Sequence, residues 1–318
     1  MKKKILITGG TGFLGINLAK KFKKKYTVVL SGRNNKLNYI AKNKTQCEVI
    51  PLDVSNINSI RDAISYTKPD IIIHAAATKF VDLSEKFPFE TIDSNVVGSS
   101  NIARVALDKK IQTVIGISTD KSSPPIKNIY GLSKSMMERL FISSSKQGNT
   151  QFSCVRYGNV AWSTGSVLPI WKKMFDKNKT ILTTGPYMRR FFFLVSDAVA
   201  LVDTALKNIK FLNGKILSRE MKSAQMIDII KTWVNIYGGK YKIIGSRSGD
   251  RQDEFLIGKE ELKYTVEKKI NNIKHYIIDF SKTHKNSIKE IVSSSSAEKL
   301  SNFDIARILK FGMKNEEE

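Results

Sequence analysis

Two groups of reactive side chains stand close together in the middle of the chain. A hydroxyl, a carboxyl and an ammonium follow one another at Thr119, Asp120 and Lys121, and a phenol and a second ammonium follow at Tyr130 and Lys134. Because Tyr130 and Lys134 are four residues apart in a helical pattern, we expect their side chains on one helix face. An ammonium there would lower the pKa of the phenol, ordinarily about 10, and make it a usable base at neutral pH. The spacing predicts proton abstraction from a hydroxyl, with an ordinary surface pair as the alternative.

Asp120 and Lys121 offer a proton donor and a proton acceptor side by side, as the elimination of water requires. At rest the Asp120 carboxylate and the Lys121 ammonium would form an ion pair. The site must therefore shift the linked protonation equilibria of the two groups so that Lys121 can become a neutral amine. A loop ion pair without catalytic work is the alternative.

The start of the chain predicts an element that binds a dinucleotide. Residues 3–8 form an apolar run typical of a short buried strand, a glycine-rich turn follows at residues 9–15, and residues 16–22 have a helical pattern. Glycines in this arrangement permit a tight turn and let the backbone approach a pyrophosphate at a helix N-terminus. A glycine-rich turn without a ligand is the alternative. The expected cofactor contacts in this turn are Gly9, Thr11, Gly12, Phe13, Leu14 and Gly15.

The end of the next expected strand, residues 26–30, indicates which dinucleotide is bound. An acidic residue there would bind the ribose 2′-hydroxyl of NAD, whereas a basic residue accommodates the 2′-phosphate of NADP. Ser31 and Arg33 follow this strand and no acid does, which favours NADP as the cofactor. The alternative is that Arg33 is a solvated loop residue without a ligand. The other expected cofactor contacts, which follow later strands or lie on the helix described above, are Asp53, Val54, Ala75, Ala76, Ala77, Tyr130 and Lys134.

The alternation of apolar, β-branched runs with helical patterns predicts the fold class. It is typical of an α/β protein with a Rossmann-like, doubly wound parallel sheet. We expect residues 1–165, with a return segment at 190–218, to form this NADP-binding domain. Residues 166–189 and 219–318 are expected to form a smaller α/β lobe that binds the substrate.

Composition narrows the classes of partner. The chain has 318 residues, with 53 Lys and Arg against 29 Asp and Glu and a formal net charge of +24. The basic residues are scattered, without a dense basic run interleaved with aromatic residues, so we expect no nucleic-acid partner. No apolar run suits a signal peptide or a membrane span, and we expect a cytoplasmic protein without membrane insertion.

The cysteines and histidines indicate neither a disulfide framework nor a metal site. Cys47 and Cys154 are far apart in sequence, which suits a reducing compartment. His74 ends an expected strand without acidic neighbours, so a structural histidine is favoured over a metal ligand.

The glycine turn and the reactive side chains near the middle of the chain resemble the extended short-chain dehydrogenase/reductases. Thr119, Tyr130 and Lys134 stand at the positions of that family's triad. Further motifs resemble the UDP-N-acetylglucosamine 4,6-dehydratases of polysaccharide biosynthesis, and among these the inverting type. The resemblance covers nearly the whole chain. The motifs lie at residues 74–77, 118–121, 130–134, 156–160, 165–169, 188–191 and 247–250.

This resemblance implies NADP-dependent 4,6-dehydration of a UDP-amino sugar, UDP-N-acetylglucosamine in the first place, with inversion at C5. It implies Asp120 as the acid toward the C6 hydroxyl and Lys121 as the base at C5. The product would serve surface polysaccharide or glycan biosynthesis, and a homo-oligomer is expected. The implied substrate contacts, of which the two arginines would approach the UDP pyrophosphate or uridine, are Lys79, Asn159, Ser166, Val167, Arg190, Arg247 and Glu254.

Two other functions stay open. A nucleotide-sugar epimerase of the same family would use the same triad but would not need Asp120 and Lys121 for elimination. A non-catalytic regulator that senses NADP would need the glycine turn alone. The sequence also departs from the family pattern at Thr164, Arg189 and Ser248, where Arg, Thr and Pro are usual, and these departures concern the substrate rather than the cofactor.

Overall fold

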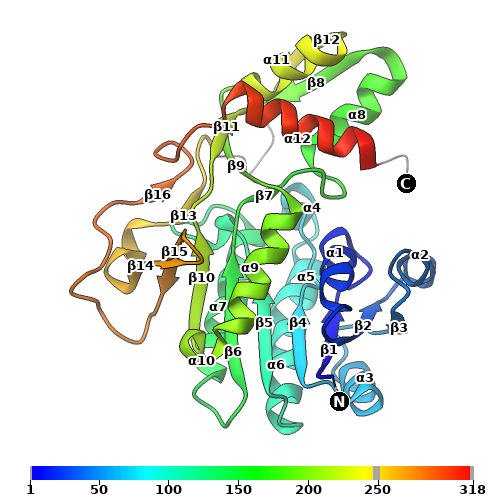
Figure 1. Cartoon of the computed structure of the whole chain (residues 1–318), viewed down its shortest axis with the longest axis vertical. Helices are drawn as coiled ribbons and strands as arrows, with labels where there is room; N and C mark the ends of the chain where they lie inside the picture. The colour runs from blue at the N-terminus through cyan, green and yellow to red at the C-terminus, as the bar shows by residue number, and fades with distance from the viewer. Residues whose placement is uncertain (1, 246–250, 316–318) are drawn as a thin grey trace.

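A large sheet forms the base of the molecule (Figure 1). The computed structural model describes residues 2–245 and 251–315. The sheet contains β1 (Lys4–Thr8), β2 (Thr27–Gly32), β3 (Glu48–Pro51), β4 (Ile71–His74), β5 (Thr113–Ile117), β6 (Gln151–Arg156), β10 (Lys215–Arg219), β14 (Thr265–Ile270) and β15 (Ile273–Ile278). Its nine strands follow the order β14-β15-β10-β6-β5-β4-β1-β2-β3, and all neighbours from β10 to β3 are parallel.

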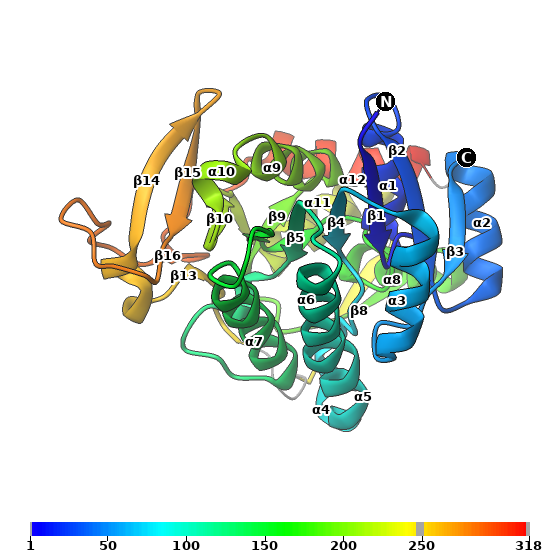
Figure 2. The ribbon, with the colours of Figure 1, turned by 90° about the horizontal axis from the view of Figure 1, so that it is seen from below.

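Helices cover both faces of this sheet, as Figure 2 shows. One face carries α1 (Phe13–Phe22) and α9 (Val195–Lys207), and the other carries α3 (Ile57–Thr67), α6 (Gly98–Asp108) and α7 (Ile129–Ser144). Strand β4 is buried on both sides, with Ile71, Ile72 and Ile73 at most 7% exposed, as a covered parallel sheet requires. The predicted doubly wound, Rossmann-like α/β fold is confirmed.

Seven further helical elements of the described residues lie along this part of the chain and in its loops. They are α2 (Asn35–Thr45), α4 (Val81–Lys86), α5 (Pro88–Ile92), η1 (Asp93–Val97), η2 (Asp120–Ser122), α10 (Ile209–Leu212) and η3 (Lys259–Tyr264). Within residues 2–245 and 251–315, no helix has the length and apolar content needed to cross a bilayer.

A smaller lobe lies at the top of Figure 1, above the ends of the parallel strands. A three-stranded sheet joins β7 (Asn159–Val160), β9 (Arg189–Phe193) and β11 (Ser223–Gln225), and β8 (Thr180–Thr184) pairs with β12 (Lys240–Ile244). Helices α8 (Val167–Asn178), α11 (Met226–Tyr237) and α12 (Asn302–Asn315) surround a separate apolar core that includes Trp171 and Trp233. The lobe is therefore a distinct layer with its own core.

The domain boundaries stay a prediction, but two strands at one edge of the large sheet come from a segment expected in the smaller lobe. Strands β14 and β15, which we had placed in the smaller lobe, extend the large sheet antiparallel to β10. Pairing with β15 covers the edge of β10 that would otherwise expose unpaired backbone groups. A further two-stranded sheet forms where β13 (Phe255–Ile257) pairs with β16 (Val292–Ser293).

Candidate active site

The glycine turn between β1 and α1 has the geometry of a phosphate cradle. Gly9 has φ +64°, and a Cβ atom on it would lie 2.6 Å from the Ala76 nitrogen. A Cβ atom on Gly15 would lie 2.4 Å from the Gly10 Cα atom, so helix and turn pack closely only with glycine. No side chain caps α1 at Gly12, which leaves its first N–H groups to an anion. These residues fit the pyrophosphate of a dinucleotide.

At the end of β2, the structure corrects one of the two residues expected to select the dinucleotide. Ser31 is completely buried, and its hydroxyl donates to the carbonyl of Ile7 at 3.3 Å, so its side chain cannot reach a ribose phosphate. The pattern missed this because Ser31 is still part of β2 and points into the sheet. Arg33 is exposed and forms an ion pair with Glu90 of α5 at 3.2 Å. Arg33 alone remains a candidate for the 2′-phosphate.

The later strand ends place the other expected cofactor residues beside this turn. Asp53 follows β3 and accepts hydrogen bonds from the amide and hydroxyl of Ser55. A Cβ atom on Gly98 would lie 2.7 Å from Val54, so α6 packs tightly on this loop. Residues 75–77 are three partly buried alanines after β4, and Ala75 and Ala76 lie against Gly9. Their contact with a cofactor stays a prediction.

His74 has a structural environment. Its Nδ1 atom lies 2.8 Å from the Thr8 hydroxyl and its Nε2 atom lies 3.1 Å from the Ser99 hydroxyl. Complete burial, together with the charge of Lys134, lowers the pKa of His74 to about 3. The neutral ring therefore joins β1, β4 and α6 beneath the site.

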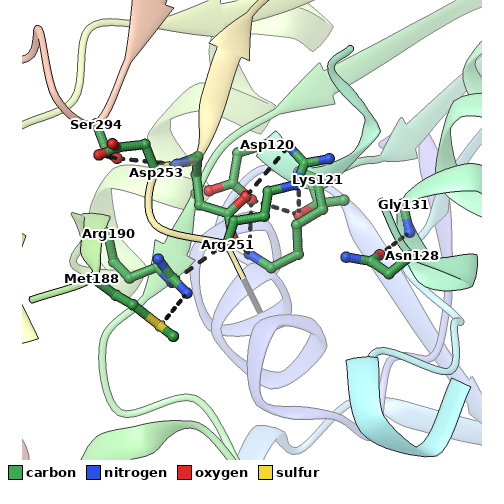
Figure 3. Close-up of polar contacts among 12 residues, drawn as sticks. Asp120, Lys121, Asn128, Gly131, Met188, Arg190, Arg251, Asp253 and Ser294 are labelled. Atoms are coloured by element: carbon green, nitrogen blue, oxygen red, sulfur yellow. Dashed lines mark hydrogen bonds and ion pairs between the residues drawn. The ribbon is translucent and has the colours of Figure 1, made fainter. Parts of the chain in front are cut away.

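Strand β5 delivers the Thr119–Lys121 segment to the same edge of the sheet. Thr119 caps the short helix η2, and the backbone N–H of Asp120 donates to the Tyr157 carbonyl at 2.9 Å. Asp120 is completely buried, and its Oδ1 atom accepts from the Thr119 hydroxyl at 3.0 Å and from Lys121 Nζ at 3.1 Å (Figure 3). The expected carboxyl and ammonium pair therefore exists.

Lys121 lies between two carboxylates. Besides Asp120, its Nζ atom lies 3.3 Å from Oε1 of Glu254, a residue that sequence reasoning had assigned to the substrate. Burial by itself would lower the pKa of Lys121, but the charges of Asp120 and Glu254 more than offset it, and the pKa is raised. Lys121 is therefore an ammonium in this arrangement.

Tyr130 and Lys134 lie on α7, whose N-terminus is capped by the Asn128 side chain accepting from the Gly131 N–H at 2.7 Å (Figure 3). The pKa of Tyr130 is raised, because burial and the charge of Asp120 outweigh the charge of Lys121 and a hydrogen bond with Thr119, which lower it. We had expected Lys134 to lower the pKa of this phenol, and the structure gives that effect to Lys121 instead.

The reason lies in the surroundings of Lys134. Its Nζ atom is buried and donates to the sulfur of Met137 at 3.2 Å, along the axis of its own helix. Burial lowers the pKa of Lys134 to about 8, although the charges of Cys154 and Glu138 act in the opposite direction. Lys134 can therefore change its charge near neutral pH.

A buried cluster of cations lies next to Lys121. Nε of Arg190 is 3.7 Å from Glu254, and its guanidinium donates to the Arg189 carbonyl and to the sulfur of Met188. Arg251, which sequence reasoning did not select, is 3% exposed, lies 3.9 Å from Glu254 and donates to the Pro125 carbonyl. Figure 3 shows these side chains converging from separate segments. Three cations face two carboxylates, which suits an anionic ligand.

The remaining expected substrate residues lie on separate loops, a strand and a helix. Lys79 is exposed beside Phe80, and Asn159 belongs to β7. Ser166 precedes α8, its hydroxyl is buried without a hydrogen-bond partner in the described part of the chain, and Val167 is the first residue of that helix. Their contact with a substrate stays a prediction. Arg247 lies outside the described residues.

Known proteins with similar sequences cover most of this chain. A protein of Methanocaldococcus jannaschii, named an uncharacterized membrane protein, is 35% identical over 329 aligned residues, which cover 97% of this chain and 95% of that protein. UDP-glucose 4-epimerase of Rickettsia bellii is 35% identical over 274 residues, covering 82% of this chain and 79% of the epimerase.

Solved structures share the fold. Pen from Bacillus thuringiensis superimposes with a TM-score of 0.89 at 25% identity and covers 98% of both chains. UDP-glucose 4-epimerase of Thermus thermophilus, solved with NAD, has a TM-score of 0.69 at 18% identity, covering 78% of this chain and 88% of that one.

The family model described as polysaccharide biosynthesis protein matches residues 5–275, which include the glycine turn and the Thr119, Tyr130 and Lys134 positions. The match therefore extends from β1 into β15, and residues 1–4 and 276–318 lie outside it. This chain belongs to the polysaccharide biosynthesis proteins of the extended short-chain dehydrogenase/reductase family.

Proposed function

We propose that this protein is a nicotinamide-dependent enzyme that removes water from a UDP-amino sugar, in the first place UDP-N-acetylglucosamine, across C5 and C6. The observation that carries the proposal is the buried Asp120–Lys121 pair, with Nζ and Oδ1 3.1 Å apart, beside Thr119 and Tyr130. A keto group at C4 acidifies the C5 proton, and a donor and an acceptor of protons side by side can then complete the elimination. The product would be a 4-keto-6-deoxy sugar nucleotide for polysaccharide or glycan biosynthesis.

Tyr130 and Thr119 serve the first step in this proposal. A nicotinamide held by the glycine turn would supply the hydride acceptor for C4 and the hydride donor for C6. Tyr130 acts as a phenolate, which the Lys121 ammonium stabilises, and it becomes a neutral phenol when it takes the proton of the C4 hydroxyl. Thr119, hydrogen-bonded to Tyr130, holds the hydroxyl in position.

The Asp120–Lys121 ion pair can supply both partners of the elimination. Transfer of one proton from the Lys121 ammonium to the Asp120 carboxylate gives a neutral amine and a carboxylic acid. The amine takes the C5 proton, and the acid protonates the departing C6 hydroxyl as water. Each group then regains its starting protonation state, so the elimination itself needs no other proton source. Addition of hydride at C6 would leave an enolate, and its C5 atom takes a proton from Lys121 or from water.

We further propose NADP as the cofactor, on the basis of Arg33. The structure adds that Glu90 neutralises Arg33 at 3.2 Å, so a 2′-phosphate must compete with this carboxylate. Arg33→Ala should narrow the preference for NADP over NAD, and Glu90→Ala should widen it, because the guanidinium is then free to pair with phosphate. Dissociation constants of both dinucleotides, measured by quenching of tryptophan fluorescence, test this. Equal affinity of the unaltered protein for NAD and NADP would contradict it.

The pKa of Lys134 leads to an expected pH dependence of sugar oxidation. Below about pH 8, Lys134 carries its proton, and above that value the ammonium is lost. If this charge supports the oxidation at C4, the rate of reduced-nicotinamide formation should fall as pH rises through about 8. Lys134→Arg keeps its charge throughout this range and should remove the alkaline fall. An unchanged alkaline fall in Lys134→Arg would assign it to another group.

A nucleotide-sugar epimerase is the second candidate, because several relatives carry the name UDP-glucose 4-epimerase. Incubation with UDP-N-acetylglucosamine, followed by mass spectrometry for the loss of water, separates the two. A product of unchanged mass but altered C4 configuration would favour the epimerase. A protein that binds NADP and turns over neither this sugar nor UDP-glucose would act as a non-catalytic sensor.

Self-association is a further part of the proposal. Phe89 on α5 is 80% exposed, and Leu132 and Met136 on the neighbouring α7 are 52% and 53% exposed. Exposed apolar side chains on adjacent helices are typical of surfaces covered by a second subunit. We therefore expect a homo-oligomer.

A further inference from the structure

Arg156, at the end of β6, forms a completely buried ion network with two glutamates from distant segments. Its Nε and Nη2 atoms donate to Glu138 of α7 at 3.0 and 2.7 Å, and its Nη1 and Nη2 atoms donate to Glu261 of η3 at 2.8 and 2.9 Å. Nη1 also donates to the Leu256 carbonyl at 2.9 Å, so every N–H of the guanidinium is used. The proposed reaction gives none of these three charged residues a role.

Both glutamates also hold the turn that follows Lys121. The Ser122 hydroxyl lies 2.9 Å from Glu138 Oε1, and it is 2.6 Å from the Thr119 carbonyl. The Ser123 hydroxyl donates to Glu261 Oε2 at 2.8 Å, and Ser123 is completely buried. The network therefore fixes the backbone on which Asp120 and Lys121 stand.

The same network fixes the opposite side of Lys121. Leu256 and Glu261 hold β13 and η3 against the η2 turn, and the amide of Gly258 donates to Glu261 Oε2 at 3.1 Å. Glu254, which pairs with Lys121, directly precedes β13. Arg156 therefore connects the segment that carries Glu254 to the segment that carries Lys121.

Stability alone is a weak reason for such a network. Removing two carboxylates and a guanidinium from water costs several kcal/mol per ion, and apolar residues of similar volume often stabilise a protein as well or better. A bidentate guanidinium with two carboxylates instead imposes one geometry on the segments it joins. Because a misplacement of about 1 Å can slow a reaction about 100-fold, such a fixed geometry matters at a catalytic turn.

The structure assigns Arg156, Glu138 and Glu261 as positioning residues, which act on the reaction by fixing the Asp120–Lys121 turn relative to Glu254 through Ser122 and Ser123. This inference rests on the proposed function, because it concerns the groups that would carry the elimination. None of the three residues needs to touch the substrate.

Ser123→Ala tests the assignment, since it removes the hydrogen bond from the turn to Glu261 and leaves the ion network intact. The matched control is Ser153→Ala on β6, where an equally buried hydroxyl donates to the Lys215 carbonyl away from the site. We expect kcat for water loss to fall about tenfold in Ser123→Ala, with KM within about twofold of its original value. Reduced nicotinamide should accumulate because oxidation is less affected, and Ser153→Ala should show neither effect.

Hydrogen exchange followed by mass spectrometry gives a readout that does not depend on turnover. Exchange in the peptide covering residues 119–123 should be faster in Ser123→Ala than in Ser153→Ala. Glu261→Gln should have the same effects on kcat and on exchange. If Glu261→Gln does not fold, the comparison of Ser123→Ala with Ser153→Ala is enough to test the assignment. If both serine variants have equal kcat and equal exchange, the assignment is wrong. If the unaltered protein turns over no UDP sugar, the proposed function fails, and hydrogen exchange alone decides whether the network holds the turn.

Discussion

Tyr130→Phe should slow oxidation of the UDP sugar at C4 on the order of 100-fold or more, because it removes the base that takes the C4 hydroxyl proton. The phenol lies where the Lys121 charge and the Thr119 hydroxyl both stabilise its ionised form, while burial opposes ionisation. Phenylalanine keeps the ring and the packing on α7, so the dinucleotide should bind as before. Formation of reduced nicotinamide after mixing with UDP-N-acetylglucosamine, followed by absorbance, measures the effect.

Tyr157→Phe is the matched control for this variant. Tyr157 is a buried tyrosine near Tyr130, and its backbone carbonyl accepts a hydrogen bond from the Asp120 N–H. Its loss of a hydroxyl should change the oxidation rate far less. Normal oxidation by Tyr130→Phe, with the cofactor bound, would show that the base has been assigned to the wrong residue.

The site residues that could be predicted from the sequence are those that directly follow parallel strands. Strand ends in a doubly wound sheet meet at one edge, so the glycine turn after β1, the alanines after β4 and Thr119–Lys121 after β5 come together without further information. Helical spacing likewise placed Tyr130 and Lys134 on one element. These expectations depend only on local periodicity and on the order of elements.

The contacts that set the charges could not be predicted in this way. Glu254 approaches Lys121, and Glu261 approaches Arg156, from segments more than 100 residues away in sequence, and no local pattern indicates either pairing. Lys134 illustrates the same limit within one helix. Spacing gave its helix face, but the direction of its ammonium toward Met137 depends on the packing around β6 and α7. The prediction for Ser31 failed for another reason. The strand continues beyond residue 30, where it was expected to end, and Ser31 is therefore a buried strand residue.

Lys121→Ala should abolish water loss while oxidation at C4 continues, because the base for the C5 proton is gone. The structure sharpens this expectation, since the Lys121 charge also lowers the pKa of Tyr130. Oxidation by Lys121→Ala should therefore be slower than in the unaltered protein but measurable. Lys121→Arg separates the two contributions, because arginine keeps the positive charge beside Tyr130 but does not become a neutral base. It should oxidise the sugar faster than Lys121→Ala and still release no water.

Exchange of the C5 hydrogen with deuterated solvent shows which group removes the proton. Both Lys121 variants should abolish this exchange, whereas Asp120→Asn should retain more of it. Removing the Asp120 charge lets Lys121 lose its proton to solvent more easily, and proton removal precedes departure of the C6 hydroxyl if an enolate forms. Glu254→Gln is the matched control: it removes the other carboxylate beside Lys121, at 3.3 Å, and leaves the amine in place, so C5 exchange should persist. Proton NMR of the fresh product in deuterated buffer also reports the configuration at C5. We expect the inverted L-arabino form; a D-xylo product would contradict inversion, and water loss by Lys121→Arg would show that another group is the base.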